Sequence, residues 1–450
     1  MSEKRSSFTG KLGFILAAAG SAVGLGNIWR FPYLAAKYGG GIFLLVYLVL
    51  TVTFGFVLMC AEIAIGRKTG QSAITAFKSL DKKFSFIGWI CAVIPAIILP
   101  YYSVIGGWVM KYFSVFATGQ MQASVEDGYF GGFIEKTAEP IVWFSLFLAL
   151  TALAVVFGVQ KGVEKVSKFM MPLLVVMILF VSIYTLFMPG AIDGLKYYLL
   201  PDFSKFSITT VLAALGQLFY SMSLAMGIMI TYGSYMKKDI GIEKSVRQIE
   251  IFDTGIAFLA GLMIIPAIFV GGNTADLSKS GPGLMFQSLP KVFNKIPGGD
   301  IIGAVFFLLV FFAAFTSSIS LMETVISIVD DKLHLGRKKV CLIVFIGALI
   351  LGLPSTLGNG IWSAVKVAGL GILDMFDFLA NNVLMPIVAL CTCIFVGFFL
   401  KPKSLIEEIE LTGPFKAKNM FTVIIKYIAP VCIVIILVSS ILNGLGIIKI

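Results

Sequence analysis

The chain has 450 residues, of which 58% are hydrophobic and 13% are charged, with a mean hydropathy of +0.97 and a formal net charge of +11. Soluble proteins carry about twice this share of charged residues, so the composition excludes an ordinary soluble domain. It leaves room for about a dozen membrane spans of ~20 residues each.

Apolar runs, taken in chain order, predict eleven transmembrane helices. They cover residues 11–36, 40–66, 84–116, 140–158, 165–188, 208–236, 246–271, 297–330, 340–358, 372–400 and 420–445. Lys4 and Arg5, followed by LGFILAAAG, also fit the start of a signal peptide. Because the apolar run continues past the small-residue site, a first membrane span is the preferred interpretation.

Dense basic clusters predict the orientation of these spans. Residues 67–83, 161–168, 237–247 and 332–339 all fall on the same side of the membrane as the N-terminus. The positive-inside rule therefore predicts a cell-membrane protein with a cytoplasmic N-terminus and an external C-terminus. The positive charge reflects this topology and contact with anionic lipid headgroups. It does not indicate nucleic acid binding, because no soluble basic module with interleaved aromatic residues occurs.

Two of the predicted spans are interrupted near their middle. The first span breaks at residues 20–27, in GSAVGLGN, and the sixth breaks at residues 221–227, in SMSLAMG. The breaks lie five spans apart, and an odd number of spans inverts a second unit relative to the first. Interrupted spans at matching positions of inverted units predict a substrate site at the midplane, since unwound backbone cannot face lipid. Close helix packing through small residues is the alternative.

The motifs at these breaks resemble those of the neurotransmitter:sodium symporters, which have the LeuT fold. The matching stretches are GSAVGLGNIWRFPY, GGGIFLLVYLVL, PYYSVIGGW, GQLFYSMSLAMG and FFAAFTSSIS. The resemblance implies an all-α membrane protein in which residues 1–450 form one transporter domain. It implies two inverted five-helix repeats, at residues 11–190 and 205–400, and an additional span at residues 418–446.

The resemblance also implies two sodium sites built from oxygen atoms near the breaks. Sodium site 1 uses a carbonyl, polar side chains and the substrate's own carboxylate; its residues are Ala22, Asn27, Ser221 and Asp253. Sodium site 2 has no formal charge and combines carbonyl groups with hydroxyls; its residues are Gly20, Val23, Ala313, Thr316 and Ser317. Taken alone, hydroxyls in a membrane span more often bond back to their own helix.

Gly24 indicates the class of substrate. Relatives that carry biogenic amines have an aspartate at this position, so a glycine leaves space for a substrate with its own carboxylate, which implies an amino acid. The carboxylate would be held by Leu25, Gly26 and Tyr102, and the amine by Ala22, Tyr220 and Ser223. The full expected substrate site is Ala22, Gly24, Leu25, Gly26, Ile98, Tyr102, Tyr220, Ser221, Ser223, Met226, Ser317 and Leu321. No charged side chain belongs to this set, which favours hydrophobic and aromatic amino acids.

Two charge pairs are expected to act as gates. Arg30 and Asp377 would close the outside, and Arg5 and Asp331, helped by Tyr235, would close the inside. Charged residues within a membrane are functional by default. Charges at the interface, as expected for the inner pair, can also be simply solvated.

Span 5 carries the family's glycine–nine residues–proline motif at Gly162 and Pro172. A proline leaves one carbonyl without its helical partner and a glycine eases local unwinding, so the motif implies a water path to sodium site 2. A static proline kink is the alternative. Phe8 departs from the family, since relatives usually have tryptophan there.

The chloride-binding residues of animal relatives are only partly present. Tyr47, Gln217 and Ser221 match them, but Ala257 replaces a serine and Asp253 replaces a neutral asparagine. A fixed carboxylate beside sodium would replace the anion, so we expect chloride-independent transport.

The expected function is a sodium-coupled symporter that imports hydrophobic or aromatic L-amino acids by alternating access with two Na⁺ ions. A carrier driven by protons or by exchange is the alternative, and a non-transporting receptor is a third. An enzyme is disfavoured, because His334 is the single histidine and no nucleophile motif occurs. The expected partners are the amino acid, sodium and the lipid bilayer. The twelfth span of many relatives is missing, so a monomer or weak homodimer is expected.

Overall fold

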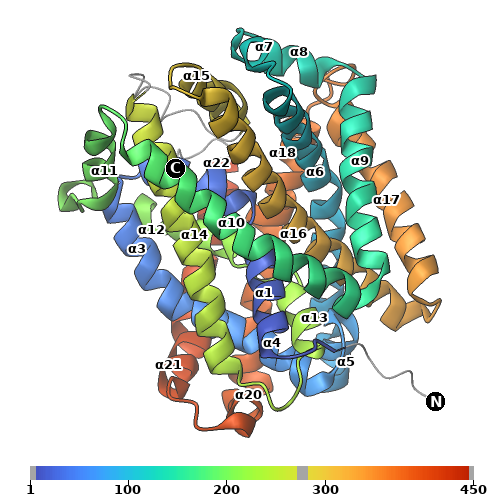
Figure 1. Cartoon of the computed structure of the whole chain (residues 1–450). Coiled ribbons are helices and arrows are strands. Elements are labelled where there is room, and N and C mark those ends of the chain that lie inside the picture. The colour runs from blue at the N-terminus through green and yellow to red at the C-terminus, as the bar shows by residue number, and fades with distance from the viewer. Residues whose placement is uncertain (1–6, 271–281, 445–450) are drawn as a thin grey trace.

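The computed structural model describes residues 7–270 and 282–444, which fold into helices without a named strand (Figure 1). Within these ranges nine helices are long and apolar enough to cross a membrane. They are Gly41–Thr69, Lys82–Ala117, Ala138–Val156, Val159–Leu186, Ile242–Val270, Gly299–Leu333, Arg337–Leu357, Ile372–Phe399 and Lys418–Gly444. Large apolar side chains such as Phe169, Val176 and Phe180 stay exposed on them. Such a surface suits lipid, as expected for a multi-pass membrane protein.

Two further predicted spans are broken helices. Lys11–Ala22 (α1) and Gly26–Lys37 form a pair bent by 53°. The predicted span 208–236 divides into α12 (Ile208–Ser221) and α13 (Ile228–Ser234). Each of the eleven predicted spans therefore corresponds to helical structure, with bounds that differ by a few residues.

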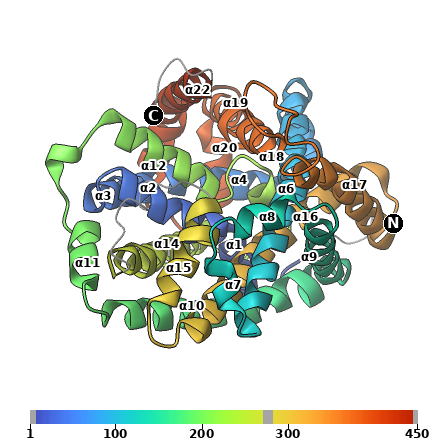
Figure 2. The ribbon, with the colours of Figure 1, turned by 90° about the horizontal axis from the view of Figure 1, so that it is seen from above.

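The broken helices lie in the middle of the molecule. Figure 2 shows α1 near the centre, and it packs against α10 (Lys165–Leu186), α14 (Ile242–Val270) and α16 (Gly299–Leu333). The second half of the other broken span, α13, packs against α4 (Phe56–Thr69). Breaks in such helices are surrounded by protein, so their free backbone groups avoid lipid.

Short helices cap the two ends of the bundle (Figure 1). At the upper end of the view lie α7 (Met121–Val125), α8 (Tyr129–Glu135) and α15 (Leu289–Asn294). At the lower end lie α5 (Ala73–Leu80), α20 (Pro402–Ile409) and α21 (Lys418–Val423). We call the lower end the basic face, because it carries the lysine-rich segment that precedes α14 and the basic first residues of α17 (Arg337–Leu357).

The remaining helices complete the bundle around this core. They are α2 (Phe31–Lys37), α3 (Gly41–Leu50), α6 (Ser85–Ala117), α9 (Ala138–Val156), α11 (Ala191–Leu199), α18 (Ile372–Asp377), α19 (Met385–Ile394) and α22 (Ala429–Gly444). Pro95 and Pro100 lie inside α6, where neighbouring helices in a membrane bundle can satisfy the freed carbonyl groups. The all-α fold expected from the sequence is confirmed, while the limits of the two repeats stay a prediction.

Candidate functional site

The break in the first span is shorter than the sequence suggested. Gly20 and Ala22 are still helical, and the helix resumes at Leu25 and runs into the wide turn Gly26–Arg30. Only Val23 and Gly24 leave the helix, and Val23 adopts an extended backbone with φ −73° and ψ 102°. At this break the carbonyl groups at the end of α1 and the N–H groups at the start of the next helix leave the helical ladder and bond to side chains instead, as Ser317 with the Ser21 carbonyl and Tyr102 with the Leu25 N–H. The carbonyl end of a helix favours a cation, and the N–H end of a helix favours a carboxylate.

The break in the sixth span, residues 222–227, is held in an unusual conformation. Ser223 and Ala225 have positive φ angles of 53° and 61°, which side chains other than glycine rarely adopt. Glu62 of α4 stabilises this loop, because its carboxylate accepts a hydrogen bond of 2.6 Å from the N–H of Ala225. The sequence prediction missed this role, although a carboxylate in an apolar span was a signal for it.

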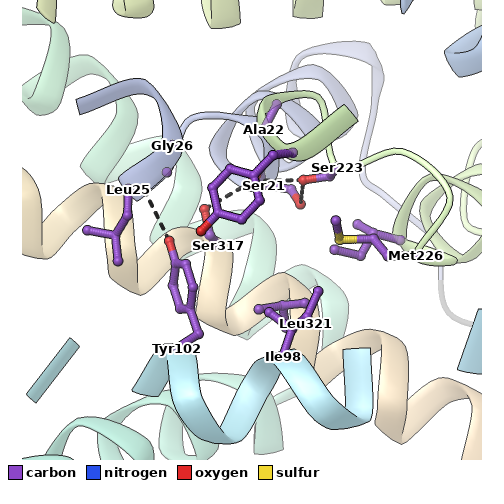
Figure 3. A pocket seen from close by; sticks show the side chains of 13 residues that line it. Ser21, Ala22, Leu25, Gly26, Ile98, Tyr102, Ser223, Met226, Ser317 and Leu321 are labelled. Carbon is purple, nitrogen blue, oxygen red and sulfur yellow. Dashed lines mark hydrogen bonds between the residues drawn. The ribbon is translucent and has the colours of Figure 1, made fainter. Parts of the chain in front are cut away.

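A cavity of about 30 Å³ lies between the two breaks (Figure 3). It is lined by Ser21, Ala22, Gly24, Leu25, Gly26, Ile98, Tyr102, Tyr220, Ser223, Met226, Ile228, Ser317 and Leu321. The set contains every expected substrate residue except Ser221. Ser21 and Ile228 were missed, since the family motifs gave no reason to single them out. No charged side chain belongs to this lining.

Polar groups of the cavity gather beside Gly24. The N–H of Leu25 donates to the Tyr102 hydroxyl at 3.2 Å, and Ser317 donates to the carbonyl of Ser21 at 3.0 Å (Figure 3). A Cβ atom on Gly24 would lie 2.7 Å from the Ser317 oxygen and 3.0 Å from the Tyr102 oxygen. A side chain at position 24 would therefore intrude on these groups.

Three of the four expected residues of sodium site 1, Asn27, Ser221 and Asp253, form one buried cluster. The carboxylate of Asp253, fully buried, accepts hydrogen bonds from Asn27 at 2.7 Å and from Ser221 at 2.8 Å. Tyr47 donates to its other oxygen at 3.3 Å. Ser221 therefore belongs to this cluster and is absent from the cavity lining, so its contact with the substrate stays a prediction. Ala22, the fourth expected residue, lines the cavity.

The expected residues of sodium site 2 also come together. The Ser317 hydroxyl lies 3.2 Å from the Val23 carbonyl oxygen and 3.5 Å from that of Gly20. The Thr316 hydroxyl lies 3.2 Å from the carbonyl oxygen of Ala313 in its own helix. Neutral oxygen atoms of this kind suit an alkali cation.

The expected outer gate is not a direct ion pair in this structure. Within the described residues no contact of 4 Å or less joins Arg30 to Asp377. The Arg30 guanidinium lies 4.9 Å from the ring centre of Tyr220. Asp377 accepts hydrogen bonds from Tyr101 at 3.1 Å and from Asn381 at 2.7 Å. Tyr101 was missed because only the fold brings α6 and span 10 together here. Asn381 was also missed, although its spacing of four residues from Asp377 in the same helix was a signal for it.

The expected inner gate is described in part, since Arg5 lies outside the described residues. Asp331 accepts a hydrogen bond of 2.9 Å from the N–H of Ser72. Tyr235 donates at 2.8 Å to Glu323, which is fully buried and forms an ion pair with Arg337. The sequence prediction missed this pair, although a carboxylate within the apolar eighth span was a signal for it.

Phe8 covers the end of the broken helices at the basic face. Its side chain is fully buried and packs edge-to-face against Phe14, Tyr232 and Tyr235, with ring centres 5.6, 5.6 and 6.1 Å away. Its N–H donates to the Tyr235 carbonyl at 3.1 Å.

The span 5 motif is helical in this structure. Gly162 lies in the wide helical turn Val159–Glu164, where a Cβ atom would come within 2.0 Å of the Ala154 carbonyl oxygen. Pro172 lies inside α10. Local unwinding of this segment therefore stays a prediction.

Comparison with known proteins decides the family. The model of the "Sodium:neurotransmitter symporter family" matches residues 5–125 and 133–446. The chain belongs to this family. Its members are secondary transporters, so the symporter is a sodium-dependent transporter and not an enzyme.

Similar proteins come from bacteria and animals. The symporter is 34% identical to an uncharacterized sodium-dependent transporter of Bacillus subtilis, over 98% of this chain and 99% of the relative. It is 26% identical to the human sodium- and chloride-dependent GABA transporter 2, over 90% of this chain and 75% of the relative. The crystal structure of MhsT in complex with L-phenylalanine matches with a TM-score of 0.88 and 37% identity, over 97% of this chain and 100% of MhsT.

Proposed function

We propose that this symporter imports hydrophobic or aromatic L-amino acids together with two sodium ions, by alternating access and without chloride. The observation that carries the proposal is the cavity between the two broken spans. Its lining combines backbone polar groups beside Gly24 with apolar side chains and contains no charged side chain. A substrate there must supply its own charges.

The backbone side of the cavity suits the common part of an amino acid. The N–H groups at Leu25 and Gly26 begin the second half of span 1, where the helix dipole favours a carboxylate. The Tyr102 hydroxyl lies beside them and can donate its own proton to the same carboxylate. Carbonyl groups of Ala22 and Tyr220, with the Ser223 hydroxyl, would hold the amine.

The opposite side suits an apolar side chain. Ile98, Met226 and Leu321 line it. The thioether of Met226 has several rotatable bonds and adapts to ligands of different shape. A charged side chain would be desolvated without a partner, which costs several kcal/mol.

The two oxygen clusters support coupling to two sodium ions. Sodium site 1 contains the buried carboxylate of Asp253 and would share the substrate's carboxylate, which links ion and substrate binding. Sodium site 2 consists of neutral oxygens from spans 1 and 8, so an ion there would join two halves of the bundle. The L-phenylalanine in the MhsT structure supports an aromatic substrate.

The test is uptake by the purified symporter in proteoliposomes under an imposed sodium gradient. Excess unlabelled leucine, phenylalanine or tyrosine should reduce the uptake of labelled leucine more than tenfold. Glutamate and lysine should leave it nearly unchanged. Stronger inhibition by glutamate or lysine than by leucine would exclude this substrate class.

The same proteoliposomes distinguish sodium symport from a carrier driven by protons or by exchange. Uptake that follows a pH gradient without sodium would show a proton-driven carrier, and uptake that needs amino acid inside the vesicles would show an exchanger.

The proposal also includes the orientation and the oligomeric state. The N-terminus lies in the cytoplasm and the C-terminus outside, and the symporter is a monomer or a weak homodimer.

A further inference from the structure

A second cavity, of about 790 Å³, opens on the basic face of the symporter. The start of α1, the segment leading into α14 and the segment after α20 form its walls. Five basic residues line it against two acidic ones. The basic residues are Lys11, Lys237, Lys244, Arg247 and Lys416. We call it the basic cavity.

Much of this positive charge has no protein partner. Lys237 donates to the carbonyl of Thr9 at 3.0 Å, and Arg247 lies 3.7 Å from the Glu243 carboxylate. In the described part of the chain the ammonium groups of Lys11, Lys244 and Lys416 have no ion pair within 4 Å. The basic cavity is therefore suited to an anion.

A third cavity, of about 480 Å³, continues from the basic cavity along the surface of α14. We call it the apolar groove. It lies between α14 and the span Gly41–Thr69. Its walls include Leu48, Val52, Ile251 and Phe258. Ile251 is 71% exposed, so the groove faces the lipid.

Arg247 joins the two cavities, since it lines both. Its guanidinium lies 4.3 Å from the ring centre of Phe56, and that ring packs against Phe415 in the wall of the basic cavity. Packing on the Phe56 ring holds the Arg247 guanidinium at the junction of the two cavities. At this junction an anionic headgroup would meet an apolar chain.

The length of the groove corresponds to one membrane leaflet. Arg247 and Phe258 are separated by about 16 Å along α14, given a rise of ~1.5 Å per residue. This is about half of the ~30 Å hydrocarbon core. The carboxyl group of Glu250 lines the groove about one turn deeper than Arg247, so a phosphate is favoured only on the headgroup side of Arg247.

We propose that these two cavities form one binding site for an anionic phospholipid, with its headgroup in the basic cavity and an acyl chain in the apolar groove. Clusters of basic residues at a membrane surface attract anionic lipids, and each lysine or arginine contributes a factor of about five in affinity. The two cavities share no lining residue with the central cavity, so the site does not depend on the proposed substrate.

The first test removes charge. Purified full-length symporter in detergent is mixed with phosphatidylglycerol or phosphatidylcholine of the same acyl chains, and bound lipids are counted by native mass spectrometry. Lys244→Gln combined with Arg247→Gln should weaken retention of phosphatidylglycerol about 25-fold. Lys244→Gln combined with Lys416→Gln leaves the Arg247 packing intact and should have a similar effect. Lys338→Gln with Lys339→Gln, two exposed lysines at the start of α17, is the matched control.

The second test fills the groove. A Cβ atom on Gly255, in the groove wall, meets no atom within 4 Å, so Gly255→Trp can enter the groove without a clash at its Cβ. It should also weaken retention of phosphatidylglycerol. Gly347→Trp on α17 is the control, since its Cβ also meets nothing within 4 Å.

Three results would overturn the lipid site. Equal loss of lipid in the control variants would show general surface attraction. Equal retention of phosphatidylcholine by the unmodified protein would exclude selection for an anion. Displacement of the lipid by inorganic phosphate, with Gly255→Trp unchanged, would assign the cavity to a soluble anion.

Discussion

At the scale of single residues, sodium site 2 depends on two neighbouring hydroxyls. We expect Thr316→Ala with Ser317→Ala to raise the sodium concentration for half-maximal substrate binding about tenfold or more, because the Ser317 hydroxyl near the Gly20 and Val23 carbonyls and the Thr316 hydroxyl near the Ala313 carbonyl are lost. Sodium-dependent binding of radiolabelled leucine to the purified protein measures this. Thr316→Val is the companion variant, since it removes one oxygen and keeps the branched shape. An unchanged sodium dependence would disprove the assignment.

The carboxylate of Asp253 is expected to make chloride unnecessary. Replacing chloride by gluconate should leave uptake by the unmodified symporter unchanged, because the buried carboxylate balances the sodium charge. Asp253→Asn with Ala257→Ser should make uptake rise several-fold with chloride. Asp253 and Ala257 lie four residues apart in the sequence, which is about one helical turn.

Ala257→Ser alone is the control for chloride, and it should show no such stimulation. Uptake by the unmodified protein that collapses in gluconate would contradict this view of Asp253. The measurement is initial uptake in vesicles with matched sodium gradients.

At the scale of elements, the spans could be predicted because a membrane demands long apolar helices. The positions of the two breaks followed from glycine and polar residues inside apolar runs. The length of the first break did not, since Gly20 is compatible with a helix when neighbours pack around it. Partners from distant spans, such as Glu62 at Ala225 or Tyr101 at Asp377, depend on tertiary contacts that no local pattern encodes.

The loop in span 6 is expected to depend on Glu62. Glu62→Leu removes the acceptor of the Ala225 N–H and should lower the free energy of unfolding by about 1–3 kcal/mol. Glu62→Gln keeps an acceptor oxygen and should lower it less. Thermal unfolding of the purified variants, followed with and without substrate, measures the difference. Equal effects of the two substitutions would mean that the hydrogen bond contributes little.

At the scale of the whole molecule, one ion pair with a fully buried carboxylate connects three helices near the basic face. Arg337 of α17 pairs with Glu323 of α16 and donates to the Val155 carbonyl of α9 at 3.1 Å. Arg337→Leu should destabilise the fold by about 3–5 kcal/mol, because it leaves a buried carboxylate without its cation.

The paired replacement distinguishes charge from packing. Glu323→Leu combined with Arg337→Leu should cost much less than Arg337→Leu alone, since no uncompensated charge remains. Thermal melts of both variants in the same detergent give the comparison. If the double variant were as unstable as the single one, the pair would act through its shape and its bonds to Tyr235 and Val155.

The burial of Phe8 sets how often the basic face can open on its own. Moving a fully buried phenyl ring into water costs about 1.5–3 kcal/mol, and its edge-to-face neighbours add to this. A difference of ~3 kcal/mol corresponds to a resting population of about one molecule in a hundred with that ring released. At equilibrium, this face therefore opens rarely. A ligand that makes opening frequent must bind the open form more tightly than the closed form by a factor of about a hundred.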